Sequence, residues 1–79
     1  MKAKKQIVVV TSGWVLIGMV TKAESGVKLT EASVIRVWGT TAGLGQIALQ
    51  GPTKDTVLDP CGDVEVPIRA VVMCIDCVV

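Results

Sequence analysis

The residue types best suited to binding chemistry stand together in one short segment, Arg36 to Thr41. If Arg36 and Trp38 lie on a strand, their side chains share one face, because they are two residues apart. A guanidinium beside an indole can bind a flat ring and a phosphate together, by stacking and by forked hydrogen bonds. A helix is predicted to follow, and its free N–H groups favour an anion. The candidate ligand-binding residues are therefore Arg36, Trp38, Thr40 and Thr41.

The same segment also has a structural interpretation. Trp38 would pack in an interface, and Arg36 would be paired at the edge of a sheet. In that case, replacing Trp38 would weaken the fold or the assembly, because truncating a buried aromatic side chain costs about 3–5 kcal/mol. The residues alone leave both interpretations open.

The other polar residues give little support for catalysis. The chain has no His, Tyr or Phe, which removes histidine-based acid–base and metal chemistry. Gly43-Leu44-Gly45 lacks the further motif residues of a phosphate-binding loop. Carboxylates between Pro52 and Pro67 are typical of turns and solvated loops, and these are Asp55, Asp59, Asp63 and Glu65. We expect no catalytic residue and no cofactor, and the protein is not expected to be an enzyme.

The three cysteines, Cys61, Cys74 and Cys77, are an odd number, which does not suit a secreted disulfide framework. Cys74 and Cys77 have the C-x-x-C spacing of redox and zinc sites. Their segment has the composition of a strand, on which residues three apart point to opposite faces, and a zinc site needs further ligands. We therefore expect no metal site, and structural thiols that are buried or half-buried.

The composition is that of one small globular domain, residues 1–79. Of these residues, 51% are apolar and 19% are charged, and the net charge is +1, which argues against disorder and against duplex nucleic-acid binding. The longest apolar stretch, Trp14 to Val20, is shorter than the ~20 residues of a membrane-spanning helix. Residues 1–5 are expected to form a basic, mobile N-terminus, and the apolar run after them is too short for a signal peptide. The expected location is the cytoplasm.

Runs of β-branched residues between turn residues predict a mainly β (α+β) fold, a small antiparallel sheet or partly open barrel of about five strands with one short helix. Residues 6–11 and 14–22 are predicted to form a hairpin around Ser12-Gly13. A third strand is predicted from Val27 to Trp38, with a bend or bulge at residues 31–33.

The helix is predicted from Thr41 to Gln50, with Thr40 or Thr41 as its N-cap and Gly51-Pro52 as its end. Residues 52–62 are predicted as a loop with a short strand at 56–58. A last strand is predicted over residues 68–79, apolar on both faces and therefore central in the sheet. Because a chain this short has little material to cover two faces, we expect a homo-oligomer.

Several short motifs follow one another from about Val9 to Cys77. They are a Ser-Gly-Trp turn at residues 12–14 with Gly18, an Arg-x-Trp segment leading into Leu-x-x-x-Ala-x-x-Gly over residues 36–51, Glu-Val-Pro at 65–67, and Cys74. In this order they resemble a family of short bacteriophage and prophage proteins of unknown function.

The resemblance implies a phage origin and a location in the host cytoplasm. Small accessory phage proteins commonly act by binding, and one class consists of compact homo-oligomers that sequester nucleotide second messengers of bacterial antiphage defence. By analogy with that class, we expect a non-catalytic homo-oligomer that binds a small nucleotide. The alternative is a protein-binding module, either an inhibitor of a host protein or a structural phage component, with Trp14 as its anchor.

Overall fold

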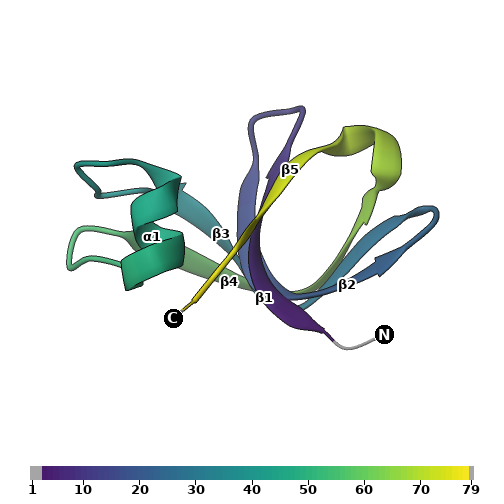
Figure 1. Ribbon diagram of the computed structural model, residues 1–79, viewed down its shortest axis with the longest axis horizontal. Helices are drawn as coiled ribbons and strands as arrows, with labels where there is room; N and C mark the ends of the chain where they lie inside the picture. Colours follow the sequence, from purple (N-terminus) through teal and green to yellow (C-terminus); the bar gives the residue numbers. More distant parts are fainter. Residues whose placement is uncertain (1–2, 79) are drawn as a thin grey trace.

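Five runs rich in β-branched residues form the strands of one antiparallel sheet in a computed structural model that describes residues 3–78 (Figure 1). The strands are β1 (Lys4–Val10), β2 (Val15–Ala23), β3 (Gly26–Val37), β4 (Val57–Pro67) and β5 (Val71–Asp76). Their order in the sheet is β4-β3-β2-β1-β5. A short helix, α1 (Leu44–Gln50), and a 3₁₀ helix, η1 (Ile68–Ala70), complete the fold. The predicted mainly β fold with one short helix is confirmed.

The sheet is strongly curled, because η1 alone connects its two edge strands. In a flat sheet with ~4.8 Å between neighbouring strands, β4 and β5 would be roughly 19 Å apart. The chain from Pro67 to Val71 can span at most about 14 Å. The N–H of Ile68 donates to Ser25 O (2.8 Å), and the N–H of Thr11 donates to Ala70 O (2.9 Å), which fastens η1 across the curl.

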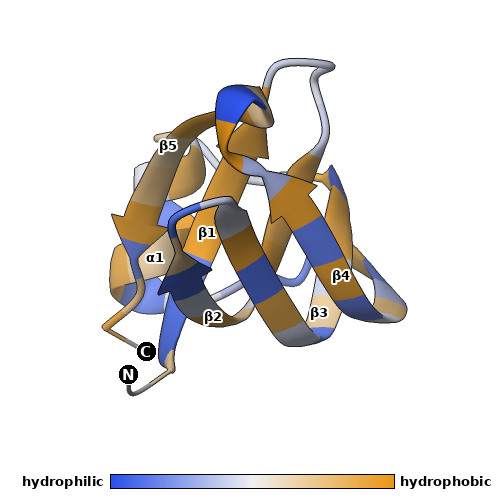
Figure 2. Cartoon of the chain, turned by 90° about the vertical axis from the view of Figure 1, so that its right-hand side faces the viewer, coloured by the Kyte–Doolittle hydropathy of each residue, from blue (hydrophilic) through white to orange (hydrophobic). Residues whose placement is uncertain are grey.

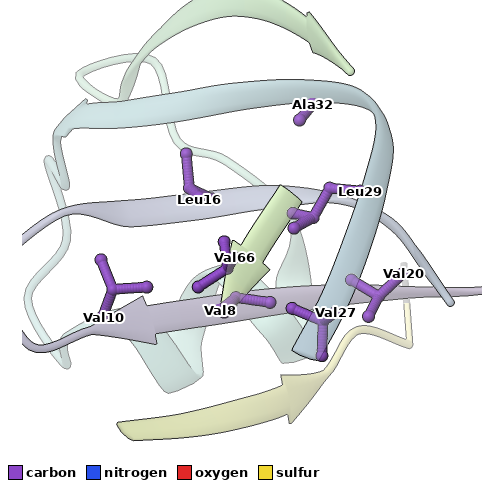
Figure 3. Close-up of a cluster of buried hydrophobic side chains, with 8 residues drawn as sticks. All are labelled: Val8, Val10, Leu16, Val20, Val27, Leu29, Ala32 and Val66. Carbon is purple, nitrogen blue, oxygen red and sulfur yellow. The ribbon is translucent and has the colours of Figure 1, made fainter. Parts of the chain in front are cut away.

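Apolar side chains form one cluster on each face of the sheet, since successive residues of a strand point to opposite faces. The inner cluster lies within the curl (Figure 3) and consists of Val8, Val10, Leu16, Val20, Val27, Leu29, Ala32 and Val66. The outer cluster lies under α1 and consists of Ile7, Val15, Ile17, Ile35, Ile47 and Ala48. β1 and β2 contribute to both clusters, so the middle of the sheet is covered on both sides.

The prediction that the last strand is central is wrong. β5 is an edge strand, and Val72 and Met73 are 54% and 50% exposed. The inner position that was predicted for the last strand is occupied by β1, which lies between β2 and β5. The predicted start at Ile68 is also wrong, because η1 occupies residues 68–70, and Val79 lies outside the described residues.

The predicted loop over residues 52–62 is strand from Val57 onward, so the short strand predicted at residues 56–58 is the beginning of a longer one. β4 runs unbroken from Val57 to Pro67 along β3, and its register with β3 shifts on either side of the Ala32↔Gly62 pair. An edge strand tolerates Pro60, because the missing N–H can face solvent. The bend predicted at residues 31–33 is confirmed by this irregularity and by the positive φ of Glu31 (51°).

The helix was predicted to start at Thr41, but it starts at Leu44, and Gly43 rather than Thr40 or Thr41 is the N-cap. No side chain caps it there. Instead, Gln46 Oε1 accepts hydrogen bonds from the N–H groups of Thr41 (3.2 Å) and Ala42 (2.8 Å) in the loop before the helix. The predicted end at Gly51 is confirmed, since its N–H donates to Ile47 O (2.8 Å).

Two lysines of the basic N-terminus belong to a strand. Residues 1–5 were predicted as mobile, but Lys4 and Lys5 belong to β1, where they pair with Val20 and Met19 of β2. Residues 1–2 lie outside the described part of the chain. None of the helices formed by residues 3–78 has the length and apolar character needed to cross a membrane.

The carboxylate of Asp76 joins the end of β5 to β1. Gln6 Nε2 donates to Asp76 Oδ1 (2.5 Å), and Lys4 Nζ lies 3.8 Å from the same oxygen. The Gln6 hydrogen bond first, and the Lys4 charge second, hold the pKa of Asp76 below its ordinary value.

We expect an NMR titration of the folded protein to place the Asp76 midpoint below the ordinary value for an aspartate. A lowered pKa means that this group stabilises the fold above its unfolded-state pKa and that the contribution is lost as the pH falls through the folded-state pKa. Gln6→Ala and Lys4→Ala should each raise the pKa of Asp76, because both partners lower it in the folded protein. An unchanged midpoint in both variants, or an ordinary midpoint in the parent, would contradict this origin.

Candidate functional site

The predicted site segment spans the end of β3 and the loop after it. Arg36 is in β3, but the strand ends at Val37, so Trp38 already belongs to the loop. Arg36 Nε lies 2.7 Å from Asp59 Oδ2 on the neighbouring strand β4. Arg36 is therefore paired at the side of the sheet, as the structural interpretation of the segment expected.

Trp38 is fixed by the loop that precedes β4. Its carbonyl oxygen accepts a hydrogen bond from Thr56 Oγ1, and Gly39 O accepts one from Thr53 Oγ1, both at 2.6 Å. Its ring lies beside Gly43, since Trp38 Cζ3 is 4.0 Å from the position that a Cβ on Gly43 would take. Trp38 is 44% exposed and lies next to the start of α1.

The two threonines have separate surroundings. Thr40 Oγ1 is shut off from solvent and has no hydrogen-bond partner among the described residues. Thr41 Oγ1 lies 3.3 Å from Gln46 Oε1, to which it can donate. Thr41 lines an open depression on the surface of α1, together with Ala42, Gly45, Gln46, Leu49 and Gln50.

Arg36 lines a different depression, in which the aromatic side chain is Trp14. We call this the Trp14 groove; its volume is about 440 Å³, and it is lined by Gly13, Trp14, Val15, Val34, Ile35, Arg36, Asp59, Pro60 and Cys61. Neither Trp38 nor Thr40 lines it or the depression at Thr41. The structure therefore does not bring the four predicted residues together in one depression.

An apolar pocket adjoins the Trp14 groove at the open side of the curled sheet. Its volume is about 320 Å³, and most of its lining is aliphatic: Val10, Leu16, Val34, Val64, Val66, Pro67 and Ala70, with Ser12 and Glu65. Trp14, Val34 and Cys61 line both the pocket and the groove. The two depressions thus form one continuous surface around the indole.

The β1–β2 hairpin positions Trp14. Its loop is closed by hydrogen bonds from Val10 N–H to Trp14 O and from Gly13 N–H to Val10 O, both 3.0 Å. Trp14 is 59% exposed, so its side chain is accessible to a ligand. Arg36 and Asp59 approach from β3 and β4, where Val34 pairs with Asp59 in the register of the two strands.

The ion pair leaves binding capacity in the groove. The hydrogen bond to Asp59 comes from Nε of Arg36, and among residues 3–78 no hydrogen bond is made by the terminal amino groups of the guanidinium. The two side chains are 63% and 48% exposed, and a pair this exposed adds only about 0–1 kcal/mol to stability. The groove therefore offers a cationic donor, a carboxylate acceptor and an aromatic face together.

The cysteines differ in exposure. Cys74 packs against the inner cluster and Cys77 against the outer cluster, so they lie on opposite faces, as predicted. Burial raises the pKa of the Cys77 thiol. Cys61 is exposed, so the prediction of a buried or half-buried thiol is wrong there. In the part of the chain that the structure describes, no group of three His, Cys, Asp or Glu residues could hold a metal ion.

Sequence reasoning missed how Trp14 and Asp59 relate to Arg36. Trp14 was considered only as an anchor for a protein partner, and Asp59 only as a solvated carboxylate. The available signal was the hairpin: a tryptophan beside a tight turn is held at one end of a sheet, where it can meet residues of the next strands.

No protein-family model, curated protein sequence or solved structure matches the chain.

Proposed function

We propose that this protein is a non-catalytic, homo-oligomeric binder of a small nucleotide in the cytoplasm of a bacterial host. In this role it is a phage accessory protein that sequesters a second messenger of antiphage defence. The supporting observation is that Trp14 and Arg36 line the same groove. The phage origin rests on the order of the sequence motifs described above.

The groove chemistry suits the parts of a nucleotide. A base can stack on the exposed indole of Trp14. The free terminal amino groups of Arg36 can form charge-assisted hydrogen bonds with a phosphate. Asp59 can accept a hydrogen bond from a ribose hydroxyl or a base N–H. A volume of about 440 Å³ lies within the range of ordinary small-molecule sites.

We expect the folded protein to be stabilised in a thermal-shift screen by cyclic di- or trinucleotides or by ADP-ribose derivatives. A ligand at 100 times its Kd should add about 2.7 kcal/mol to the free energy of unfolding. Trp14→Ala should weaken binding by about 1–3 kcal/mol through lost stacking. Arg36→Ala should weaken it by about 1.5–3 kcal/mol through a lost charged hydrogen bond. Isothermal titration calorimetry measures both changes.

Trp38→Ala is the matched control for Trp14→Ala, because both remove an exposed indole and Trp38 lies outside the groove. It should leave nucleotide binding unchanged. If Trp38→Ala, Thr40→Ala or Thr41→Ala abolishes binding while Trp14→Ala does not, the ligand binds at the start of α1, where the sequence predicted it. If no nucleotide stabilises the parent protein, the proposal is wrong.

The apolar pocket supports a second candidate, the protein-binding module. Its aliphatic lining and the adjacent Trp14 suit an apolar side chain of a partner protein, since tryptophan is common at binding hot spots. For such a partner, Trp14→Ala should abolish capture from host lysate, whereas Arg36→Ala should have little effect. A nucleotide ligand predicts losses in both variants, so this pair of variants separates the two functions.

A further inference from the structure

The outer edge of β5 carries unpaired backbone groups. In the sheet, β5 pairs with β1 alone. The N–H of Cys77 donates to Lys5 O (3.0 Å), so the backbone groups of Cys77, Ile75 and Met73 face β1, because they alternate along an antiparallel strand. The N–H and C=O groups of Cys74 and Asp76 therefore point away from the sheet. Such a row of groups is a template on which a strand of another chain can pair.

The other edge of the sheet is protected along its length, whereas β5 is covered only just past its end, where the N–H of Val78 donates to Ala48 O of α1 (2.8 Å). β4 contains Pro60 and Pro67, each without an N–H, and its hydrophilic residues appear as bands along the strand (Figure 2). Proline and charge are the usual means of preventing an edge strand from pairing. β5 has no proline and is apolar apart from Asp76, and Val72 and Met73 are half-exposed on it.

We propose that the outer edge of β5 pairs with the same edge of a second copy, antiparallel and across a two-fold axis at Cys74. The two sheets then become one continuous sheet through the dimer. This proposal deepens the homo-oligomeric part of the proposed function and does not depend on the ligand.

A second copy of the chain suits this edge because its backbone groups and its charges are complementary to those of the same edge. With the axis at Cys74, the outward backbone groups of the two Cys74 residues face each other, and Asp76 of each copy lies opposite Val72 of the other. No like charges then face each other across the axis, and each Asp76 carboxylate also lies 3.8 Å from Lys4 Nζ of its own chain. A net charge of +1 adds little repulsion between copies. The Trp14 groove is formed by β3, β4 and the β1–β2 hairpin, so pairing through β5 leaves its lining residues uncovered.

The first test measures mass without any ligand. Sedimentation equilibrium of the parent chain at micromolar concentration should give a dimer, and Met73→Lys should give a monomer under the same conditions, because a lysine on an edge strand opposes pairing. Leu49→Lys is the matched control, since Leu49 is an exposed apolar residue on α1, and it should remain a dimer. A monomeric parent would overturn the proposal while leaving nucleotide binding to be judged by its own experiment.

The second test locates the two-fold axis and does not depend on how well Met73→Lys folds. Directly opposite residues in a hydrogen-bonded antiparallel pair have Cα atoms about 5.5 Å apart, which is within the range of a disulfide. In a Cys61→Ser, Cys77→Ser background, mild oxidation should therefore link two chains through Cys74. Variants that retain only Cys61 or only Cys77 should stay unlinked. Failure of the Cys74 variant to form a covalent dimer, or equal linking of all three, would overturn this placement of the axis.

Discussion

Replacing Ile47 with alanine is expected to lower the free energy of unfolding by about 2–5 kcal/mol. Ile47 is 1% exposed and belongs to the outer cluster. The helix that carries it has seven residues, too few to be stable alone, so its packing on the sheet holds it in place. Removing the Ile47 side chain leaves a cavity over β1 and β2 and loosens the only helix that covers this face among the described elements.

Leu49→Ala is the control for that prediction. Leu49 lies two residues further along the same helix and is 62% exposed, so its truncation should change stability by no more than about 0.5 kcal/mol. Urea denaturation followed by tryptophan fluorescence measures the free energy of unfolding of both variants. If this free energy depends on urea concentration with the same slope in both variants and the parent, only stability has changed. Similar losses in the two variants would mean that the outer cluster does not depend on α1.

The local elements were predictable from sequence because their signals are local. Ser12-Gly13 between two β-branched runs indicates a hairpin whatever the rest of the chain does. The apolar positions Leu44, Ile47 and Ala48, followed by Gly51-Pro52, fit the structured part of the helix. The disruption at Glu31 was visible as a break in the apolar alternation of the strand.

The position of each strand in the sheet was not predictable in this way. β5 is apolar on both faces, which normally indicates a central strand. Its edge position depends on β1 pairing with both β2 and β5, and no residue of β5 specifies that arrangement. Most of β4, beyond the short strand predicted at residues 56–58, was missed for another reason: Pro60 and Gly62 are loop signals, and a strand that contains such a proline is usually an edge strand.

The candidate site shows the same division between local and long-range information. The segment from Arg36 to Thr41 was selected because its residues are close in sequence. In the fold, the chain turns away after Val37, and Arg36 meets Asp59 of β4 and shares its groove with Trp14 of the hairpin. An aromatic ring and a guanidinium do line one groove, but the ring is that of Trp14, which is distant from Arg36 in the sequence. Such a combination follows from strand register, which a single sequence does not specify.

The connection after β3 depends on Gly39. Its φ is +62°, in the left-handed region that residues with a side chain rarely adopt. A Cβ at this position would also overlap the backbone of Asp55 and Thr56, which cannot move like the end of a side chain. The hydrogen bond from Thr53 Oγ1 to Gly39 O (2.6 Å) holds the two loops at this close approach.

Gly39→Ala is therefore expected to destabilise the fold by about 2–5 kcal/mol, the sum of the left-handed strain and the overlap. Gly45→Ala is the matched substitution, and it is expected to change the free energy of unfolding in the opposite direction. Gly45 lies in α1, and a Cβ there would meet nothing within 4 Å, so alanine should stabilise the protein by about 0.5–1 kcal/mol. Thermal and urea unfolding of the two variants and the parent give both values. A neutral Gly39→Ala would mean that the loops at residues 38–43 and 52–56 can separate without loss, and the fixed position of Trp38 beside α1 would then have no structural basis.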